Sequence, residues 1–206
     1  MISARRRWCA TRHAPQDRGQ IMSDGTLKIL GIAGSLRRGS FNAAALRAAQ
    51  ELAPAGMTID IFDIAPIPLY NEDVRAQGFP PAVVDLRARI KAADGLLLAT
   101  PEYNYSISGV LKNVIDWASR PPEHPFDGKP IALMGASGGA LGTARAQYHL
   151  RHMFIFLNAH ILNRPEVFIG GAPGKFDAEG KLTDQPTRDI IAAMLVAYQA
   201  WIKKLS

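Results

Sequence analysis

The sequence predicts a doubly wound α/β domain with a five-stranded parallel sheet. Short apolar runs alternate with longer segments of helical periodicity from Leu27 almost to the end of the chain, without internal repeats or a low-complexity linker. The short runs are apolar throughout, which is typical of parallel strands that helices cover on both faces. In such a fold ligands bind beyond the carboxyl ends of the strands, so function is expected in the loops that follow them.

The expected elements can be placed one after another along the chain. "LKILGIA" is the first buried strand, and the alanine-rich "FNAAALRAAQELA" is the first helix. Pro101 ends the third strand, and the closing helix carries a continuous apolar face. The expected strands are residues 27–33, 57–64, 95–100, 130–137 and 165–170, and the expected helices are residues 41–53, 82–93, 108–119, 143–159 and 187–205.

The composition is ordinary for a globular protein, with 48% hydrophobic and 20% charged residues in a chain of 206. The formal net charge is +6, but most of it lies in residues 1–21, where five arginines face Asp17 alone. The rest of the chain is nearly neutral, which argues against a large nucleic-acid interface. The single cysteine, Cys9, lies in the same segment, so we expect no disulfide or cysteine nucleophile in the folded body.

Residues 1–21 are expected to be a basic N-terminal extension, either disordered or upstream of a working start at Met22, because they show no apolar pattern. A single domain is expected over residues 26–204. The extension lacks the apolar run of a secretory signal, and no window has the roughly 18 continuous apolar residues that a membrane span needs. We therefore expect a cytoplasmic protein that contacts neither nucleic acid nor membrane.

The loop after the first expected strand, "GSLRRGS", has the chemistry of an anion-binding turn. It precedes a helix, whose first N–H groups and dipole favour a negative charge. Ser35 and Ser40 offer hydroxyl groups, and Asn42 offers an amide. Arg37 or Arg38 offers a full positive charge, so the turn suits a phosphate dianion.

Two familiar phosphate motifs do not fit this loop. Gly34 and Gly39 have the separation of a Walker loop, but Ser40 occupies the position of the required lysine. The closely spaced glycine pair of a dinucleotide turn is also missing. The remaining interpretations are a site for a terminal monophosphate, or a helix capped by Ser40 beside two solvated arginines.

The loop after the third expected strand, "TPEYNYSISGVLKN", places two tyrosines and an amide at the mouth of the expected crevice. Aromatic rings and amide groups suit a planar heterocycle with a hydrogen-bonding edge. A structural turn whose tyrosines only cover the end of the sheet is the alternative.

The loop after the fourth expected strand, "MGASGGALG", matches the Gly-x-Ser-x-Gly pattern of serine hydrolases at Ser137. In the α/β-hydrolase order an acid and then a histidine must follow the serine, but His160, the last histidine, precedes Glu166, the first acid after Ser137. The hydrolase interpretation therefore fails. The glycines are better explained by close access of a flat ligand to the backbone.

Three motifs, "GSLRRGSFN", "PEYNYSISGVLKNVIDW" and "GASGGALG", in this order and spacing, resemble the NADPH-dependent FMN reductase family, in particular its chromate and quinone reductase branch. The resemblance covers about residues 26–204. It implies a flavodoxin-like three-layer fold with strand order 2-1-3-4-5 and FMN at the switch point. It also implies ping-pong hydride transfer from NADPH or NADH through FMN to quinone, flavin, azo or metal-oxyanion acceptors, in a homodimer or homotetramer.

The resemblance further implies which residues bind FMN, while the flavin itself does the chemistry, so that no catalytic side chain and no metal ligand is named. Arg38 is expected to be a bystander, because neighbouring residues in a turn rarely face one ligand. The implied cofactor residues are Ser35, Arg37, Ser40, Phe41, Asn42, Pro101, Glu102, Tyr103, Asn104, Ser137 and Gly138.

Two other functions remain open at this stage. One is a flavodoxin-like electron carrier that docks with protein partners, although carriers of that kind are usually acidic and this body is slightly basic. The other is a phosphate binder without catalysis, which would not need the second loop. His149 and His152, three residues apart, would need a third ligand to form a metal site and are more simply surface or interface residues.

Overall fold

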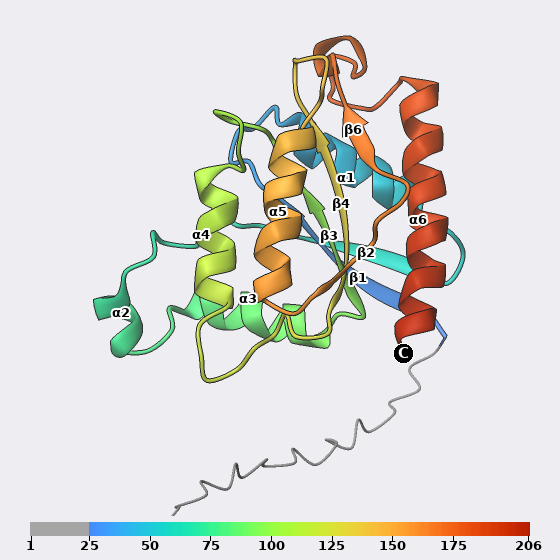
Figure 1. Cartoon of the computed structure of the whole chain (residues 1–206). Coiled ribbons are helices and arrows are strands. Elements are labelled where there is room, and N and C mark those ends of the chain that lie inside the picture. The colour runs from blue at the N-terminus through green and yellow to red at the C-terminus, as the bar shows by residue number, and fades with distance from the viewer. Residues whose placement is uncertain (1–24) are drawn as a thin grey trace, which may run out of the picture.

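Four long parallel strands form the centre of the computed structural model, which describes residues 25–206 (Figure 1). The expectation for residues 1–21 lies outside the described residues. The strands are hydrogen-bonded in the order β2-β1-β3-β4, as predicted. Their bounds are β1 Leu27–Ala33, β2 Met57–Phe62, β3 Gly95–Ala99 and β4 Pro130–Ala136.

The fifth position of the sheet is shared by two short strands. β5 (His160–Ile161) pairs with the beginning of β4, and β6 (Val167–Ile169) pairs with its end, both parallel. The predicted order 2-1-3-4-5 is therefore confirmed, but only β6 was expected. Pro165 lies between the two pieces and has no N–H to donate, so one continuous ladder cannot run through it.

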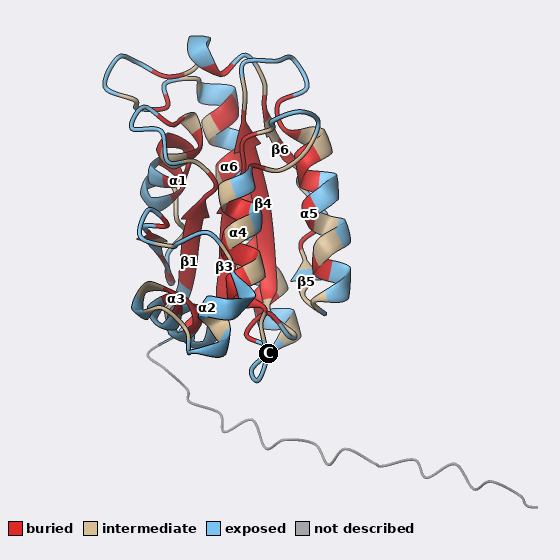
Figure 2. Ribbon diagram, turned by 90° about the vertical axis from the view of Figure 1, so that its left-hand side faces the viewer, coloured by how far each residue is buried: buried red, intermediate tan, exposed pale blue. Residues whose placement is uncertain are grey.

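Helices cover both faces of the sheet. One layer packs α1 and α6 against alternate strand residues such as Ile29 and Leu97, and the other packs α3, α4 and α5 against their neighbours Leu30 and Leu96. Figure 2 shows the buried sheet between these two half-buried layers. The helices are α1 Phe41–Glu51, α2 Glu72–Ala76, α3 Pro81–Ala92, α4 Gly109–Ala118, α5 Ala144–Phe156 and α6 Gln185–Leu205, with a 3₁₀ turn at Ala172–Gly174.

Two helical details differ from the sequence prediction. The short α2 was not expected, because it buries none of its residues and so leaves no apolar pattern. The helix expected over residues 143–159 ends at Phe156, since Asn158 takes a left-handed conformation with φ 53°. The chain can then turn directly into β5.

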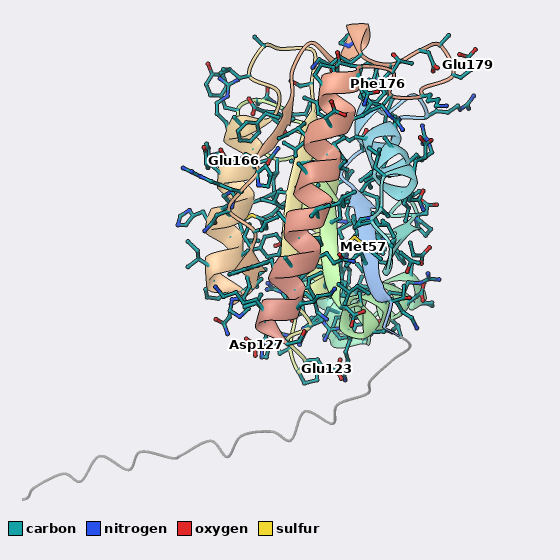
Figure 3. All side chains as sticks on the ribbon, turned by 90° about the vertical axis from the view of Figure 1, so that its right-hand side faces the viewer. Met57, Glu123, Asp127, Glu166, Phe176 and Glu179 are labelled. Atoms are coloured by element: carbon teal, nitrogen blue, oxygen red, sulfur yellow. The ribbon has the colours of Figure 1, made fainter. Side chains whose placement is uncertain are left out.

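The carboxyl ends of β1, β3, β4 and β6 lie at one edge of the sheet, uppermost in Figure 1, and their loops gather there. Phe176, in the loop that leads to α6, marks this edge in Figure 3, whereas Glu123 and Asp127 mark the opposite one. The ring of Phe176 packs on that of Phe41 with centroids 5.2 Å apart, which ties this last loop to the start of α1. No helix in residues 25–206 is long and apolar enough to cross a membrane.

Candidate active site

A hollow of about 230 Å³ opens at the carboxyl edge, between the loops that follow β1, β3 and β4. Ten of the eleven predicted cofactor residues line it, and Asn104 is the exception. Ala136, the last residue of β4, also lines the hollow and was not predicted. A small apolar residue carries no chemical signal, and only its place at a strand end could have drawn attention to it.

The start of α1 supplies unpaired hydrogen-bond donors to this hollow. Ser40 is the N-cap, and its Oγ accepts from the N–H of Ala43 at 3.2 Å. The next two N–H groups, of Phe41 and Asn42, have no acceptor within residues 25–206. These two groups, the Ser40 hydroxyl proton and the positive end of the helix dipole are therefore available to an anion in the hollow.

The two neighbouring arginines of this loop are placed differently. The Arg37 guanidinium donates to the carbonyl of Gly39 at 2.6 Å and lies 5.1 Å from the centroid of the Phe41 ring. Arg37 lines the hollow, and Arg38 does not. The positive charge at this wall is therefore that of Arg37, and packing against Phe41 restricts its position.

The side chain of Asn42 has a different role from the predicted phosphate contact. It is buried, its Nδ2 donates to the carbonyl of Ala136 at 3.0 Å, and its Oδ1 accepts from the N–H of Ala136 at 2.8 Å. The amide thus joins the start of α1 to the end of β4. Only the backbone N–H of Asn42 remains available for the phosphate contact that the sequence predicted.

Glu102 in the second loop is also occupied by the protein itself. Its carboxylate is 7% exposed and accepts from the N–H groups of Arg145 at 3.0 Å and Ala146 at 3.2 Å, and from Nε of Arg145 at 2.6 Å. Thr143, the N-cap of α5, makes no capping bond with its own side chain. Glu102 therefore caps α5 from a distant loop, and this carboxylate is not free to make the predicted contact with a flavin ring.

Residues 103–106 form a two-residue hairpin at the mouth of the hollow. Tyr103 and Ser106 exchange two backbone hydrogen bonds of 3.0 Å, and Asn104 and Tyr105 between them have φ of 49° and 64°. Two left-handed residues define a type I′ turn, which suits asparagine at its first position. Asn104 thus lies at the tip of the hairpin, away from the hollow, while Tyr103 lines it.

A cation–π contact with α5 holds the tip of the hairpin. The Arg145 guanidinium lies 3.7 Å from the centroid of the Tyr105 ring, which fixes the otherwise exposed tyrosine. Tyr105 adopts a left-handed backbone that a tyrosine rarely takes, and this contact helps to hold it there.

The glycines of the third loop serve packing as well as access. A Cβ on Gly135 would lie 2.1 Å from Oγ1 of Thr143, and one on Gly142 would lie 2.9 Å from backbone atoms beside Ile169. At Gly138, which lines the hollow, a Cβ would meet nothing within 4 Å. The explanation by ligand access therefore suits Gly138 and is wrong for Gly135 and Gly142.

Ser137, the serine of the Gly-x-Ser-x-Gly match, is used within the same loop. Its Oγ donates to the carbonyl of Gly142 at 2.5 Å, and its backbone N–H donates to the carbonyl of Ile169. A hydroxyl that donates to a carbonyl, and that bonds to no histidine within residues 25–206, is not an activated nucleophile. The structure thus agrees with rejecting the hydrolase interpretation.

The histidine pair of α5 lies outside this hollow. Nδ1 of His149 is 2.9 Å from Oγ of Ser106, and His152 lies one turn further along the helix. Within residues 25–206 no three His, Cys, Asp or Glu side chains are grouped closely enough to hold a metal ion.

Comparisons with known proteins agree with the geometry. The family model described as NADPH-dependent FMN reductase matches residues 27–174. The NAD(P)H-dependent FMN reductase PA1204 of Pseudomonas aeruginosa is 61% identical over 184 residues, 89% of this chain and 99% of that protein. The quinone reductase of Escherichia coli K12 is 43% identical over 182 residues, 87% of this chain and 97% of that protein.

A solved structure extends the same likeness to three dimensions. FerB, a flavoenzyme NAD(P)H:(acceptor) oxidoreductase from Paracoccus denitrificans, superposes with a TM-score of 0.79 and 34% identity, covering 87% of this chain and 98% of that one. The predicted resemblance is thereby confirmed along almost the whole described chain. The loops after β1, β3 and β4 and the sheet that places them together are those of the NADPH-dependent FMN reductase family, to which this chain belongs.

Proposed function

We propose that the hollow at the carboxyl edge holds FMN, with its phosphate at the start of α1 and its ring against the second and third loops. The observation that carries this assignment is the pair of unpaired N–H groups, of Phe41 and Asn42, beside the Ser40 hydroxyl and the Arg37 guanidinium. These are the donors that a phosphate dianion requires.

The other wall of the hollow suits the flat part of the cofactor. Pro101, Glu102 and Tyr103 line it from one loop, and Ser137 and Gly138 line it from another. The open space at Gly138 lets the backbone approach a planar ring closely. Asn104 is not assigned to this contact, because the hairpin holds it at the tip.

Membership of the family makes the chain an NAD(P)H-dependent oxidoreductase of the FMN reductase and quinone reductase type, with FMN as its cofactor. The flavin, when bound, supplies the hydride and electron transfer. The protein binds the phosphate, orients the ring through Tyr103 and the glycine loop, and leaves one side of the hollow open to reactants. We assign no acid or base side chain to the reaction.

The acceptors follow from the open mouth of the hollow. Small planar or compact oxidants can reach it, and we propose quinones, free flavin, azo compounds and metal oxyanions such as chromate as substrates. Tyr103 is half exposed there and offers an aromatic face to a quinone ring. Cytoplasmic NAD(P)H is the electron source that this activity needs, so we place the enzyme in the cytoplasm.

We also propose that the chain works as a homodimer or homotetramer. Ile155 and Phe156, near the end of α5, are 75% and 87% exposed, which is unusual for large apolar side chains on a helix. A second copy packed on this end of α5 would bury them. Sedimentation measures the oligomeric state: the native chain should be assembled, and a Phe156→Ser variant should be dissociated.

Flavin content and its reduction test the function directly. The purified protein should show the absorbance of oxidised flavin, and anaerobic NADPH or NADH should bleach it. A protein that stays colourless after addition of FMN would overturn the proposal. Bound flavin that neither nucleotide bleaches would instead identify an electron carrier.

A further inference from the structure

A second hollow, of about 450 Å³, shares a wall with the proposed flavin site. Tyr103 lines the flavin hollow, and its hairpin partner Ser106 lines the second one, so the same two-residue hairpin separates them. The remaining wall comes from the beginning of α4 and from α5, through Ile107, Gly109, Lys112, His149, His152 and Met153.

Three of these side chains are basic, and none of the lining residues is acidic. Lys112 carries a full charge, although Asp116 one turn further along α4 pairs with it at 2.7 Å. His149 and His152 add the N–H groups of two imidazole rings. The hollow therefore offers an anion one ammonium group and the N–H donors of two imidazole rings.

The histidine nearest the hairpin is held in place. Ser106 Oγ lies 2.9 Å from Nδ1 of His149, while Nε2 of the same ring has no partner within residues 25–206. No Asp or Glu contacts this histidine in the same residues, so Ser106 and His149 lack the third group that would orient a nucleophile and its base. The arrangement suits binding through Nε2 rather than catalysis by the serine.

We infer that this hollow binds a phosphate group of the nicotinamide dinucleotide donor. The inference rests on the proposed function, which places the nicotinamide ring against the flavin. The rest of the dinucleotide must then leave the flavin hollow, and the hairpin wall leads directly to Lys112, His149 and His152. The phosphate concerned is either the pyrophosphate that both donors share or the 2′-phosphate that only NADPH carries.

The test compares two hollow variants with two matched controls. His152→Gln and Lys112→Gln each remove a basic side chain from the exposed rim of the hollow, while His160→Gln and Lys203→Gln remove the same kinds of side chain from exposed positions elsewhere. For the FMN-loaded enzyme, KM and kcat are measured with NADPH and with NADH. Calorimetry measures the binding of adenosine 2′,5′-bisphosphate and of 5′-AMP, with and without flavin.

Each hollow variant should raise the donor KM about tenfold, the size expected for one hydrogen bond to a charged group, while kcat stays within about twofold. The calorimetric affinity should fall by a similar factor, and the controls should match the wild type. A loss confined to NADPH and adenosine 2′,5′-bisphosphate assigns the 2′-phosphate. An equal loss for both donors assigns the pyrophosphate.

Unchanged donor KM and ligand affinity in both hollow variants, or a rise in the acceptor KM alone, would overturn the inference. Its failure is separable from failure of the proposed function. Calorimetry on the flavin-free chain tests the phosphate site even if FMN does not bind. Normal flavin reduction in every variant would leave the FMN assignment standing and remove only the phosphate site.

Discussion

Replacing Asn42 with alanine removes the two side-chain hydrogen bonds that join the start of α1 to the end of β4. Both bonds go to the backbone of Ala136, which is itself buried. The variant would leave a buried N–H and a buried carbonyl without partners. We therefore expect the fold itself to lose stability, whether or not flavin is present.

The size of the loss follows from those two groups. Each unsatisfied buried group costs about 1–3 kcal/mol, and relief from burying the amide offsets part of the sum, so we expect a loss of about 3 kcal/mol in the free energy of unfolding. For a domain of this size such a loss lowers Tm by about 6–12 °C.

Urea unfolding of the flavin-free protein measures this free energy without the stabilisation that bound FMN would add. Asn104→Gly is the matched control, because it removes an asparagine amide at the exposed hairpin tip and keeps a residue that tolerates the left-handed backbone. The reasoning fails if the flavin-free Asn42→Ala protein is as stable as the wild type and only its affinity for FMN has fallen. Such a result would make the side chain a phosphate ligand.

Three further changes test other parts of the site and the fold. Arg37→Ala should weaken FMN binding about tenfold in a fluorescence titration, and Arg38→Ala should change it less than twofold; equal effects would show that the wrong arginine was assigned. Glu102→Gln should lower the free energy of unfolding by about 1–2 kcal/mol, because an amide keeps one acceptor but loses the charge that caps α5; unaltered stability in urea would contradict that capping role. Burial lowers the pKa of Lys129 below its ordinary value of 10.5, and its Nζ donates to the carbonyl of Ala93 at 2.5 Å. Because the folded pKa is the lower one, the wild type should gain stability relative to Lys129→Met as the pH rises from the folded pKa towards 10.5; a difference that stays constant with pH would refute this.

The sequence was sufficient for the four long strands and for the loops that line the hollow, because both follow from the alternation of apolar runs and helices. Apolar runs separated by helices predict the parallel sheet, while its strand order came from the family resemblance. In that order the polar loops after β1, β3 and β4 meet at one edge. The split fifth strand was not visible, because β5 has only two residues and no pattern.

The individual roles of the site residues were harder to predict, since they depend on partners far along the chain. The side chain of Asn42 bonds to Ala136, and that of Glu102 bonds to Arg145. Both side chains were predicted to contact the cofactor, but they make hydrogen bonds within the protein instead. No spacing rule reveals such contacts. The geometry of a turn predicts only that one of Arg37 and Arg38 faces a ligand, and the choice of Arg37 came from the family resemblance. Arg37 is the one that lines the hollow.

The carboxylate of Glu102 links the loop that lines the hollow to helix α5. It belongs to the loop that lines the flavin hollow, yet it holds the first turn of α5, and the far end of that helix carries the exposed Phe156. In the proposed oligomer, a second copy that orders α5 would also order the loop of Glu102. Any tightening of cofactor binding by assembly would then be matched by an equal effect of the cofactor on assembly.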